Sequence, residues 1–417
     1  MSDPTFGISI TRIDNEPRPA VWSDMAIVGL VGTAPDADAQ VFPLDTPVFL
    51  YSDDRTKLTA LGATGTLQDA VTGINDQLGE FQVAARIVVV RVDEGVDTDA
   101  TIQNIIGSGA SGTGIHALID AGPVLGIIPR LIACPGYTSQ QPTANEANAV
   151  CAALPSVLAK LLAHAVVDGP ATTEQAATDW RETISSDRLI PVDPAVKILS
   201  GGITVIVPAS PRILGIAVRR DHEKQGRPFH SWANQPVHGI VGPSRPINFS
   251  LTDGATEGQS LLSNNIGVIL RGELGVETAI ASGGFVYVGT DNAGEDDLWR
   301  FYNVTRGRDY IHLMLLRTLR FYLGRFNITG QTVQAILNTM SFALRDLKAD
   351  SDILGYEIKF TRDQNSPEQL RLGRFTVNFA AEEPPVLRYL GIQSARYRPA
   401  LDALLDDLLA QVDAVVG

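Results

Sequence analysis

The chain has 417 residues, of which 44% are hydrophobic and 19% are charged, and this length exceeds one ordinary core, so two or three domains are expected. Its formal net charge of −14 disfavours nucleic acid or an anionic membrane as the partner of the whole body. The N-terminus, MSDPTFGISI, lacks the basic and then apolar layout of a signal peptide, and no apolar run approaches the roughly 18 residues that span a bilayer. We therefore expect a globular protein that stays in a cytoplasm.

The first expected element is a short strand on a tether. Phe6, Ile8 and Ile10 alternate with small or polar residues, which is the period of a half-buried strand. The DNEPRPAV segment that follows contains two prolines, which favour an extended linker over a local hairpin. Such a strand either fills a distant edge in its own subunit or pairs with another chain, because an unpaired strand leaves its backbone donors and acceptors open.

From residue 25 to about residue 223, short apolar runs alternate with amphipathic stretches. This alternation predicts an α/β layout with a largely parallel sheet. The expected strands are residues 26–32, 48–51, 85–92, 130–134 and 164–168. The expected helices are residues 67–78, 99–106, 115–121, 144–162, 173–184 and 211–220.

The pattern changes after residue 238. The segments GIVGPSRPINFSLTDG (239–254) and GGFVYVG (283–289) have a strand-like composition. A surface helix is expected over 331–348, with one apolar face and one polar face. Two further strands are expected over 374–380 and 386–392, and a last helix begins near Pro399, a favourable residue for a first turn.

The stretch RFYNVTRGRDYIHLMLLRTLRFYLGR (300–325) is a basic part of an acidic chain. Six arginines against one aspartate give it a formal charge of +5 and leave −19 to the rest. Apolar side chains cover about two-thirds of a helical wheel, and the remaining narrow stripe holds Asp309, Arg317, Arg320 and Gly324. A helix that binds nucleic acid has a broad basic face, so this pattern indicates a mostly buried helix with charges on its edge.

A search for catalytic motifs gives little. GSGASG (107–112) has the spacing of a dinucleotide loop, but a helix rather than a strand is expected before it, so a flexible turn is favoured. The sequence has no Walker A loop, no G-x-S-x-G elbow and no H-E-x-x-H helix. One alternative is a soluble α/β nucleotide-binding protein or enzyme that uses the Gly107–Gly114 loop. Another is a nucleic-acid or membrane-surface module built on the arginine segment.

Polar clusters elsewhere have simple interpretations. Three histidines spaced eight apart do not share a helix face, and the glycine and prolines around them predict an irregular loop, so a metal site is not favoured. Asp221 and the two arginines before it are expected to form exposed pairs that fix this loop. The two cysteines are expected to be buried free thiols. The residues are His222, His230 and His238, and Cys134 and Cys151.

Seven segments, in their order and spacing, carry a resemblance to a known family. They are AIVGLVGTAPDADAQVFPLDTPVFL (26–50), ARIVVVRVDEG (85–95), TGIHALIDAGPVLGIIPRLIACPG (113–136), HAVVDGP (164–170), RRDHEKQGRPFHSWANQPVHGIVG (219–242), LLSNNIGVILRGELGVETAI (261–280) and the arginine stretch. The sequence resembles the contractile tail sheath proteins of myophages and R-type bacteriocins, most nearly the compact P2-like and pyocin-type subunits. The likeness spans nearly the whole chain.

The resemblance implies an α/β fold, of mixed α+β content, with a two-domain sheath subunit and extended strand-donating arms at both ends. The expected organisation is an N-terminal arm and linker over 1–24, α/β outer domains over 25–235, a C-terminal inner sheath domain over 236–383, and an arm strand and terminal helix over 384–417. Phe6, Ile8 and Ile10 become the candidate inter-subunit strand.

The resemblance also implies a structural rather than enzymatic role, without a cofactor, metal or catalytic residue. Subunits of the family stack as hexameric rings around a tail tube and contract to drive the tube through a cell envelope. The implied partners are copies of the chain itself, the tube protein, and baseplate and tail terminator proteins, with no direct nucleic acid or membrane. The implied location is the tail sheath of a virion that is assembled in the host cytoplasm.

Two sets of residues are candidates for contacts in such an assembly. Arginines on one helix are interpreted as forks for carboxylates, within the subunit or across an interface. The polar face of the 331–348 helix is the candidate that faces the tube. The charged-interface candidates are Arg306, Arg308, Arg317 and Arg320, and the tube-facing candidates are Gln334, Asn338, Arg345 and Lys348.

Overall fold

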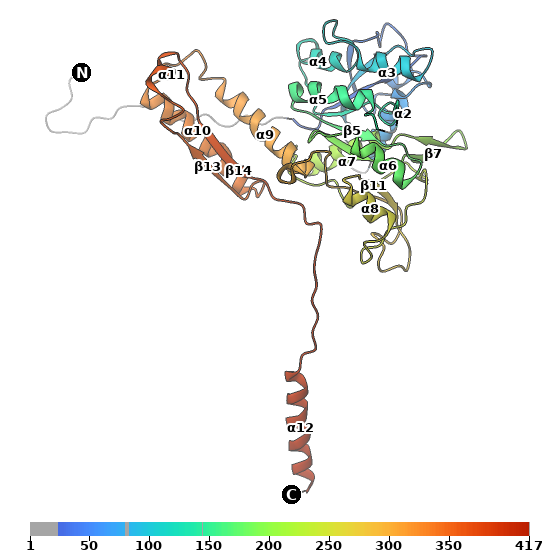
Figure 1. Ribbon diagram of the computed structural model, residues 1–417, viewed down its shortest axis with the longest axis vertical. Helices are drawn as coiled ribbons and strands as arrows, with labels where there is room; N and C mark the ends of the chain where they lie inside the picture. Colours follow the sequence, from blue (N-terminus) through green and yellow to red (C-terminus); the bar gives the residue numbers. More distant parts are fainter. Residues whose placement is uncertain (1–23, 80–82, 144, 417) are drawn as a thin grey trace, which may run out of the picture. The chain divides into compact units, whose positions relative to one another are not determined.

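The structure, a computed structural model, describes residues 24–79, 83–143 and 145–416 (Figure 1). It divides into two units, the first ending at Pro385 and the second beginning at Val386. The candidate arm strand with Phe6, Ile8 and Ile10 lies outside the described residues. Among the described residues, no helix combines the length and the apolar character that crossing a bilayer requires.

A six-stranded sheet forms the centre of the α/β part of the first unit. Its strand order is β2-β3-β1-β4-β5-β6, and every neighbouring pair is parallel except β2 with β3. Strands β1, β4 and β5 are buried along their whole length, as expected where helices cover both faces. The five strands expected here are confirmed. The bounds are β1 Val28–Thr33, β2 Pro47–Tyr51, β3 Arg86–Val92, β4 Leu131–Ala133, β5 His164–Asp168 and β6 Leu189–Val192.

Helices pack on both faces of this sheet. One core contains buried residues of α2 and α7, and the other contains buried residues of α3, α4, α5 and α6. The expected helices are confirmed, with shifted ends. Helix α5 begins only after Asn148, because this side chain accepts hydrogen bonds from the first helical N–H groups. The bounds are α1 Arg55–Ala60, α2 Leu67–Asp76, α3 Thr98–Ile106, α4 Ala117–Leu125, α5 Ala149–Leu161, α6 Glu174–Glu182 and α7 Ser210–Glu223.

Two small antiparallel sheets follow, β10-β7-β8 and β11-β12-β9, with helix α8 beside β11. Strand β12 confirms the expectation for 283–289. The strand expected over 239–254 is wrong over most of its length, because only β10 forms there. The two prolines of the segment, Pro243 and Pro246, lack the N–H group that strand pairing needs. The bounds are β7 Val196–Ser200, β8 Ile203–Val207, β9 Gln235–Pro236, β10 Gly242–Pro243, α8 Glu257–Ser263, β11 Val268–Arg271 and β12 Phe285–Val288.

The rest of the first unit is built on two long helices and a two-stranded sheet, which share a core of their own. Helix α10 confirms the helix expected over 331–348. Strand β14 starts four residues later than expected, because the Asn365 side chain bonds both the N–H and the carbonyl of Thr376 and removes them from the ladder. The bounds are 3-10 helix η3 Asp297–Trp299, α9 Tyr302–Leu319, α10 Gly330–Ala349, β13 Gly355–Lys359, α11 Pro367–Arg371 and β14 Asn378–Glu382.

Helix α9 corrects the helical-wheel interpretation of the arginine stretch in two ways. The helix ends at Leu319, so Arg320 and Gly324 lie beyond it and do not continue its stripe. Asp309 was placed on the exposed stripe, but it is only 3% exposed. The expectation of a mostly buried helix is confirmed for its first two-thirds.

The second unit contains residues 386–398 and helix α12 (Pro399–Val416). The last helix is confirmed. The strand expected over 386–392 is not formed in the single chain. Four large apolar residues of that segment, Leu387, Tyr389, Leu390 and Ile392, are exposed.

The Gly107–Gly114 loop follows helix α3, not a strand, so it lacks the context of a dinucleotide loop. It closes on itself, because the N–H of Ser108 donates to Oγ1 of Thr113, and it is fixed from outside by Asp45, which accepts a hydrogen bond from the N–H of Gly114. Gly107 has a φ of +61°, and a Cβ there would lie 2.2 Å from the carbonyl oxygen of Thr113. This loop is therefore a tight structural turn.

We expect Gly107→Ala to destabilise the chain by about 1–3 kcal/mol, because the left-handed backbone and the short contact both penalise a side chain. Gly109→Ala is the matched control, since a Cβ there meets nothing closer than 3.5 Å, and it should change stability by less than about 0.5 kcal/mol. Urea unfolding followed by tryptophan fluorescence measures both. Equal effects of the two variants would contradict the structural interpretation of the loop.

Candidate functional site

The first turns of helix α9 carry a set of buried charges that connect three parts of the first unit. Most residues in this part of the helix are buried, so a charged side chain here needs a partner. Gly307 lets the helix approach closely, because a Cβ at this position would lie 2.6 Å from the ring of Phe229. We call Asn303, Thr305, Arg306, Arg308 and Asp309 the α9 anchor.

Arg306 connects α9 to helix α7. Its guanidinium is fully buried and donates to both oxygens of Asp221, at 2.6 and 3.2 Å. It also donates to the carbonyl of Met25 at 3.3 Å and lies 4.9 Å from the ring centre of Trp232. Burial raises the pKa of Asp221, and Arg306 opposes this rise by favouring the carboxylate. The pair therefore fixes α7, α9 and the chain at Met25 to one another.

The expectation that Asp221 forms exposed pairs in a loop is wrong. Helix α7 continues to Glu223, and Asp221 is 1% exposed on its buried face. The partner, Arg306, lies 85 residues later in the chain, so local spacing could not reveal it. His222 lies on the same helix rather than in an irregular loop.

Arg308 and Asn303 hold the chain that leaves strand β14. Arg308 pairs with the buried Glu383 through Nε at 2.8 Å and Nη2 at 2.9 Å, and it donates to the carbonyl of Ala381. The side-chain amide of Asn303 donates to the carbonyl of Pro384 at 3.2 Å. The segment that leads to the second unit is thus fixed to α9 within two turns of the point that holds Met25.

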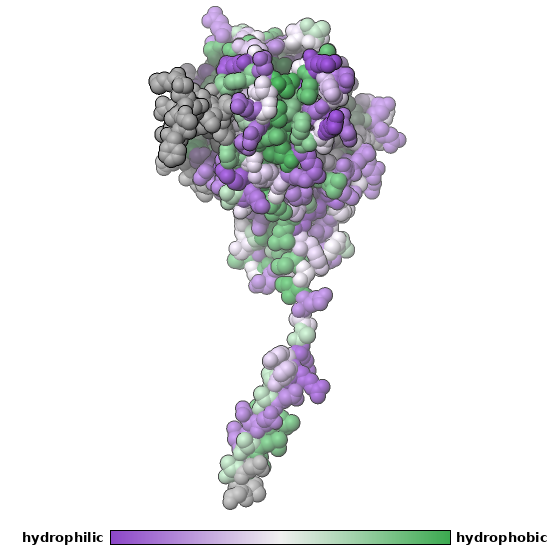
Figure 2. Space-filling view, turned by 90° about the vertical axis from the view of Figure 1, so that its left-hand side faces the viewer, coloured by the Kyte–Doolittle hydropathy of each residue, from purple (hydrophilic) through white to green (hydrophobic). Residues whose placement is uncertain are grey.

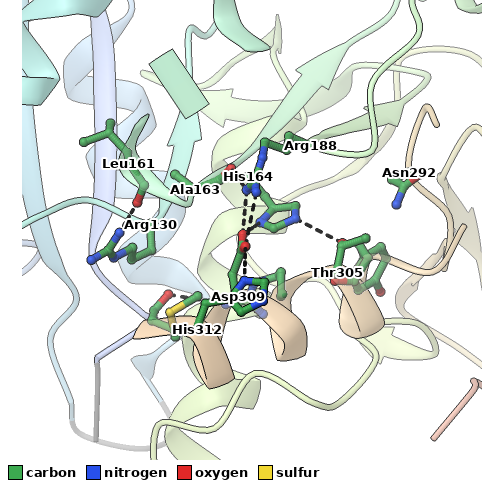
Figure 3. A network of polar contacts seen from close by, with 12 residues as sticks. Arg130, Leu161, Ala163, His164, Arg188, Asn292, Thr305, Asp309 and His312 are labelled. Carbon is green, nitrogen blue, oxygen red and sulfur yellow. Dashed lines mark hydrogen bonds and ion pairs between the residues drawn. The ribbon is translucent and has the colours of Figure 1, made fainter. Parts of the chain in front are cut away.

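Asp309 connects α9 to the central sheet (Figure 3). It accepts two hydrogen bonds from Arg188, which precedes β6, at 2.5 and 3.1 Å. The same guanidinium donates to the carbonyl of Ala163 at 3.3 Å. His164, the first residue of β5, lies beside this pair, with Nδ1 3.9 Å from Asp309 and Nε2 3.0 Å from the hydroxyl of Thr305. Two sheet strands are therefore joined to the helix through one carboxylate.

His164 is buried and uncharged. Burial lowers its pKa to about 3, because the charged form loses its hydration, while Asp309 acts in the opposite direction and Arg188 and Arg306 reinforce the decrease. The ring is held by Thr305 rather than by a full ion pair with Asp309. This histidine is a neutral part of the anchor, and it will resist protonation as long as the chain is folded.

The structure separates the charged-interface candidates into two pairs. Arg306 and Arg308 pair within the subunit. Arg317 is half-buried near the end of α9, and Arg320 is exposed just beyond it. The tube-facing candidates Gln334, Asn338, Arg345 and Lys348 are all exposed on α10.

Sequence reasoning identified the arginines but missed their partners. The missed residues come from distant elements and carry no local signal. One feature of the sequence could have predicted that partners exist. A charged residue on a mostly apolar helix becomes buried, and a buried charge needs a counter-charge. The missed partners are Asp221, Glu383, Arg188 and His164.

Groups that resemble catalytic chemistry have structural roles. Burial raises the pKa of Asp168 to about 6, and its carboxylate accepts from the N–H and the hydroxyl of Ser210 at the start of α7. The two cysteines are buried and free, as expected, and burial raises the pKa of both thiols. Within the described ranges, no three His, Cys, Asp or Glu side chains are grouped so that they could hold a metal.

Arg306→Met should lower the free energy of unfolding by about 3–5 kcal/mol, because Asp221 is left buried without a counter-charge. Adding Asp221→Asn to the same chain should recover part of this loss. Arg320→Met, on an exposed arginine, is the control and should cost less than about 0.5 kcal/mol. Urea unfolding tests all three, and a small effect of Arg306→Met would show that the anchor does not hold α9.

His164 also predicts a pH dependence. Its pKa is lower in the folded chain than the ordinary value of 6.5, so the unfolded chain binds more protons between these values. The stability from the neutral ring is complete above about pH 6.5 and declines as the pH falls toward 3. The stability difference between the natural chain and His164→Gln should therefore shrink from pH 7.5 to pH 4.5, as measured by urea midpoints. A difference that stays constant would contradict a neutral His164.

No model of a known protein family matches the chain. Among curated proteins, it is 27% identical over 406 residues to the tail sheath protein of Escherichia phage P2, covering 94% of this chain and 96% of that protein. It is also 27% identical to a putative prophage major tail sheath protein of Pseudomonas aeruginosa (strain UCBPP-PA14), over 91% of this chain and 93% of that protein.

The fold is also found in solved structures. The sheath of the extracellular contractile injection system PVC, in its contracted state, matches with a TM-score of 0.67 over 95% of this chain and 99% of that chain. The contracted helical sheath of the anti-feeding prophage matches with a TM-score of 0.64 over 95% and 100%. Sequence identity is 14% in both cases, so these two comparisons show a shared fold and nothing further. Along nearly its whole length, the chain is similar in sequence to phage tail sheath proteins and similar in fold to the sheaths of contractile injection systems.

Proposed function

We propose that the chain polymerises as stacked hexameric rings around a tail tube, and that the sheath shortens to drive the tube through a cell envelope. The observation that carries the proposal is the end-to-end match to tail sheath proteins, which leaves no large part of the chain for another activity. The role is structural and non-catalytic. Residues 25–235 are proposed to form the outer part of the subunit and residues 236–383 the inner part, toward the tube.

The proposed partners are other copies of the chain, the tube protein, and the baseplate and tail terminator proteins at the two ends of the sheath. The proposed location is the tail of a phage or phage-like particle that is assembled in the host cytoplasm. The exposed polar side chains of α10 (Gln334, Asn338, Arg345, Lys348) are the proposed tube contact. Arg320, which is exposed just beyond the end of α9, is the proposed charged contact between subunits, together with Arg317.

Strand donation between copies is proposed at the β13-β14 sheet. Within the described residues this sheet has only two strands, so each strand has an outer edge that no further strand pairs with. A groove of about 330 Å³ lies between α10 and β13, with Leu337, Tyr356, Ile358 and Phe360 among its lining residues. A strand added at the β13 edge would direct every second side chain toward this groove.

The alternating apolar residues Phe6, Ile8 and Ile10 of a neighbouring copy suit this groove. Each added hydrogen bond contributes roughly 0.5–1.5 kcal/mol, whereas ordering the arm costs roughly 1–2 kcal/mol per residue. One donated strand is therefore a modest link. A sheath gains strength because every subunit repeats the link.

Electron microscopy of the purified chain should show rings or tubes, and Ile8→Asp should shorten or abolish them, because a carboxylate would be buried in the groove. Ser9→Asp is the matched control, since it adds the same charge to the opposite face of the strand. Deletion of residues 2–19 should have the effect of Ile8→Asp. Tubes of full length from the deleted chain would rule out strand donation by the N-terminal arm.

A further inference from the structure

The end of helix α9 borders an apolar groove that no described residue fills. The groove has a volume of about 450 Å³ and is lined by Leu162, Leu315, Leu316, Leu319 and Leu323, with His312 and Arg320 at its sides. Leu316 is 61% exposed and Leu323 is 77% exposed. We call this the Leu316 groove. Large apolar side chains gathered on one surface are characteristic of a binding site.

Helix α12 offers a surface of matching character. Its leucines recur at the spacing of one helix face, and the aspartates lie beside and opposite that face. Figure 2 shows hydrophobic residues, in green, next to hydrophilic ones, in purple, on this helix. The apolar side chains are between 48% and 65% exposed, so the second unit does not bury them itself. They are Leu401, Leu404, Leu405, Leu408, Leu409 and Val412.

The charges of the two surfaces are complementary. The sequence of α12 contains four aspartates and no lysine, arginine or histidine. Arg320 lies in the wall of the Leu316 groove, and Arg325 follows it closely in the chain. A leucine face flanked by carboxylates can therefore enter an apolar groove that has Arg320 in its wall, which buries apolar surface and brings opposite charges together.

The connection between the units favours another copy as the source of the helix. Thirteen residues, 386–398, precede α12 and can extend to roughly 43–47 Å. Leu387, Tyr389, Leu390 and Ile392 in this connection are exposed in the single chain and are apolar enough to form the C-terminal arm strand that the sequence resemblance implies. If the connection crosses to a neighbouring subunit, the helix at its end is delivered to that subunit as well.

We propose that α12 of one copy docks through its leucine face into the Leu316 groove of a second copy. The inference rests on the proposed self-assembly, and it specifies a further contact between copies. The buried leucines supply the attraction, and the aspartates and Arg320 set the orientation of the helix.

Cross-linking between two differently tagged full-length chains tests the proposal. One chain carries Leu323→Cys and the other carries Leu405→Cys, and they are assembled together and treated with a short bismaleimide. The natural cysteines are buried at 1% exposure and should give little background. We expect a cross-linked product that contains both tags. Asp406→Cys, on the opposite face of α12, replaces Leu405→Cys as the control and should lose this product. Leu316→Asp in the Leu323→Cys chain should also abolish it.

The other outcomes overturn the proposal in distinguishable ways. Assembled tubes without the mixed product would disprove the docking site while leaving the sheath function standing. A product only when both cysteines are on the same chain would show that α12 occupies its own groove. Capture of added tube protein by Leu323→Cys, in place of the mixed product, would assign the groove to the tube. If the natural chain forms neither rings nor tubes, the proposed function fails and this inference fails with it.

Discussion

A guanidinium removed from water must find a counter-charge, and Arg306 finds one in Asp221 of helix α7. Burying each ion costs several kcal/mol, so an arrangement of α9 that left either one unpaired would be strongly disfavoured. The main effect of the pair is therefore to specify one position of α9 against the α/β sheet, rather than to add stability. The contacts of Arg308 and Asp309 depend on that position, because they lie within the next turn of the same helix.

The three charges lie on two sides of α9, and this geometry explains how one helix contacts α7, the central sheet and the chain after β14. Positions three apart share a face of a helix, so Arg306 and Asp309 both reach the α/β part, whereas Arg308 is rotated away toward Glu383 and strand β14. Gly307 lies between them and gives Phe229 room to pack. The run RGRD thus places alternating charges on opposite sides of a helix that is otherwise apolar.

The central sheet could be predicted from sequence because its signals are local. A parallel strand buried on both sides is a short run of Val, Ile and Leu, and RIVVVRV shows this without reference to the rest of the chain. The site was only half predictable. Arg306 and Arg308 were visible on an apolar helix, but Asp221 and Glu383 are each 75 or more residues away and look like ordinary surface acids. The late start of β14 depends on Asn365, whose side chain binds the backbone of Thr376. Strand propensity alone assigns Thr376 to the strand.

In the proposed assembly, a pull on the ends of the chain would reach the subunit at two carbonyl oxygens that α9 holds. Arg306 binds the carbonyl of Met25, and three residues earlier in the same helix Asn303 binds the carbonyl of Pro384. A pull applied through the residues before Met25 and after Pro384 is therefore transmitted across one turn of α9. The six-stranded sheet lies outside this line of force and is attached to it from the side through Asp221 and Arg188. In a row of such subunits, the load would pass from one α9 to the next. The larger α/β parts could then move relative to their neighbours without being stretched.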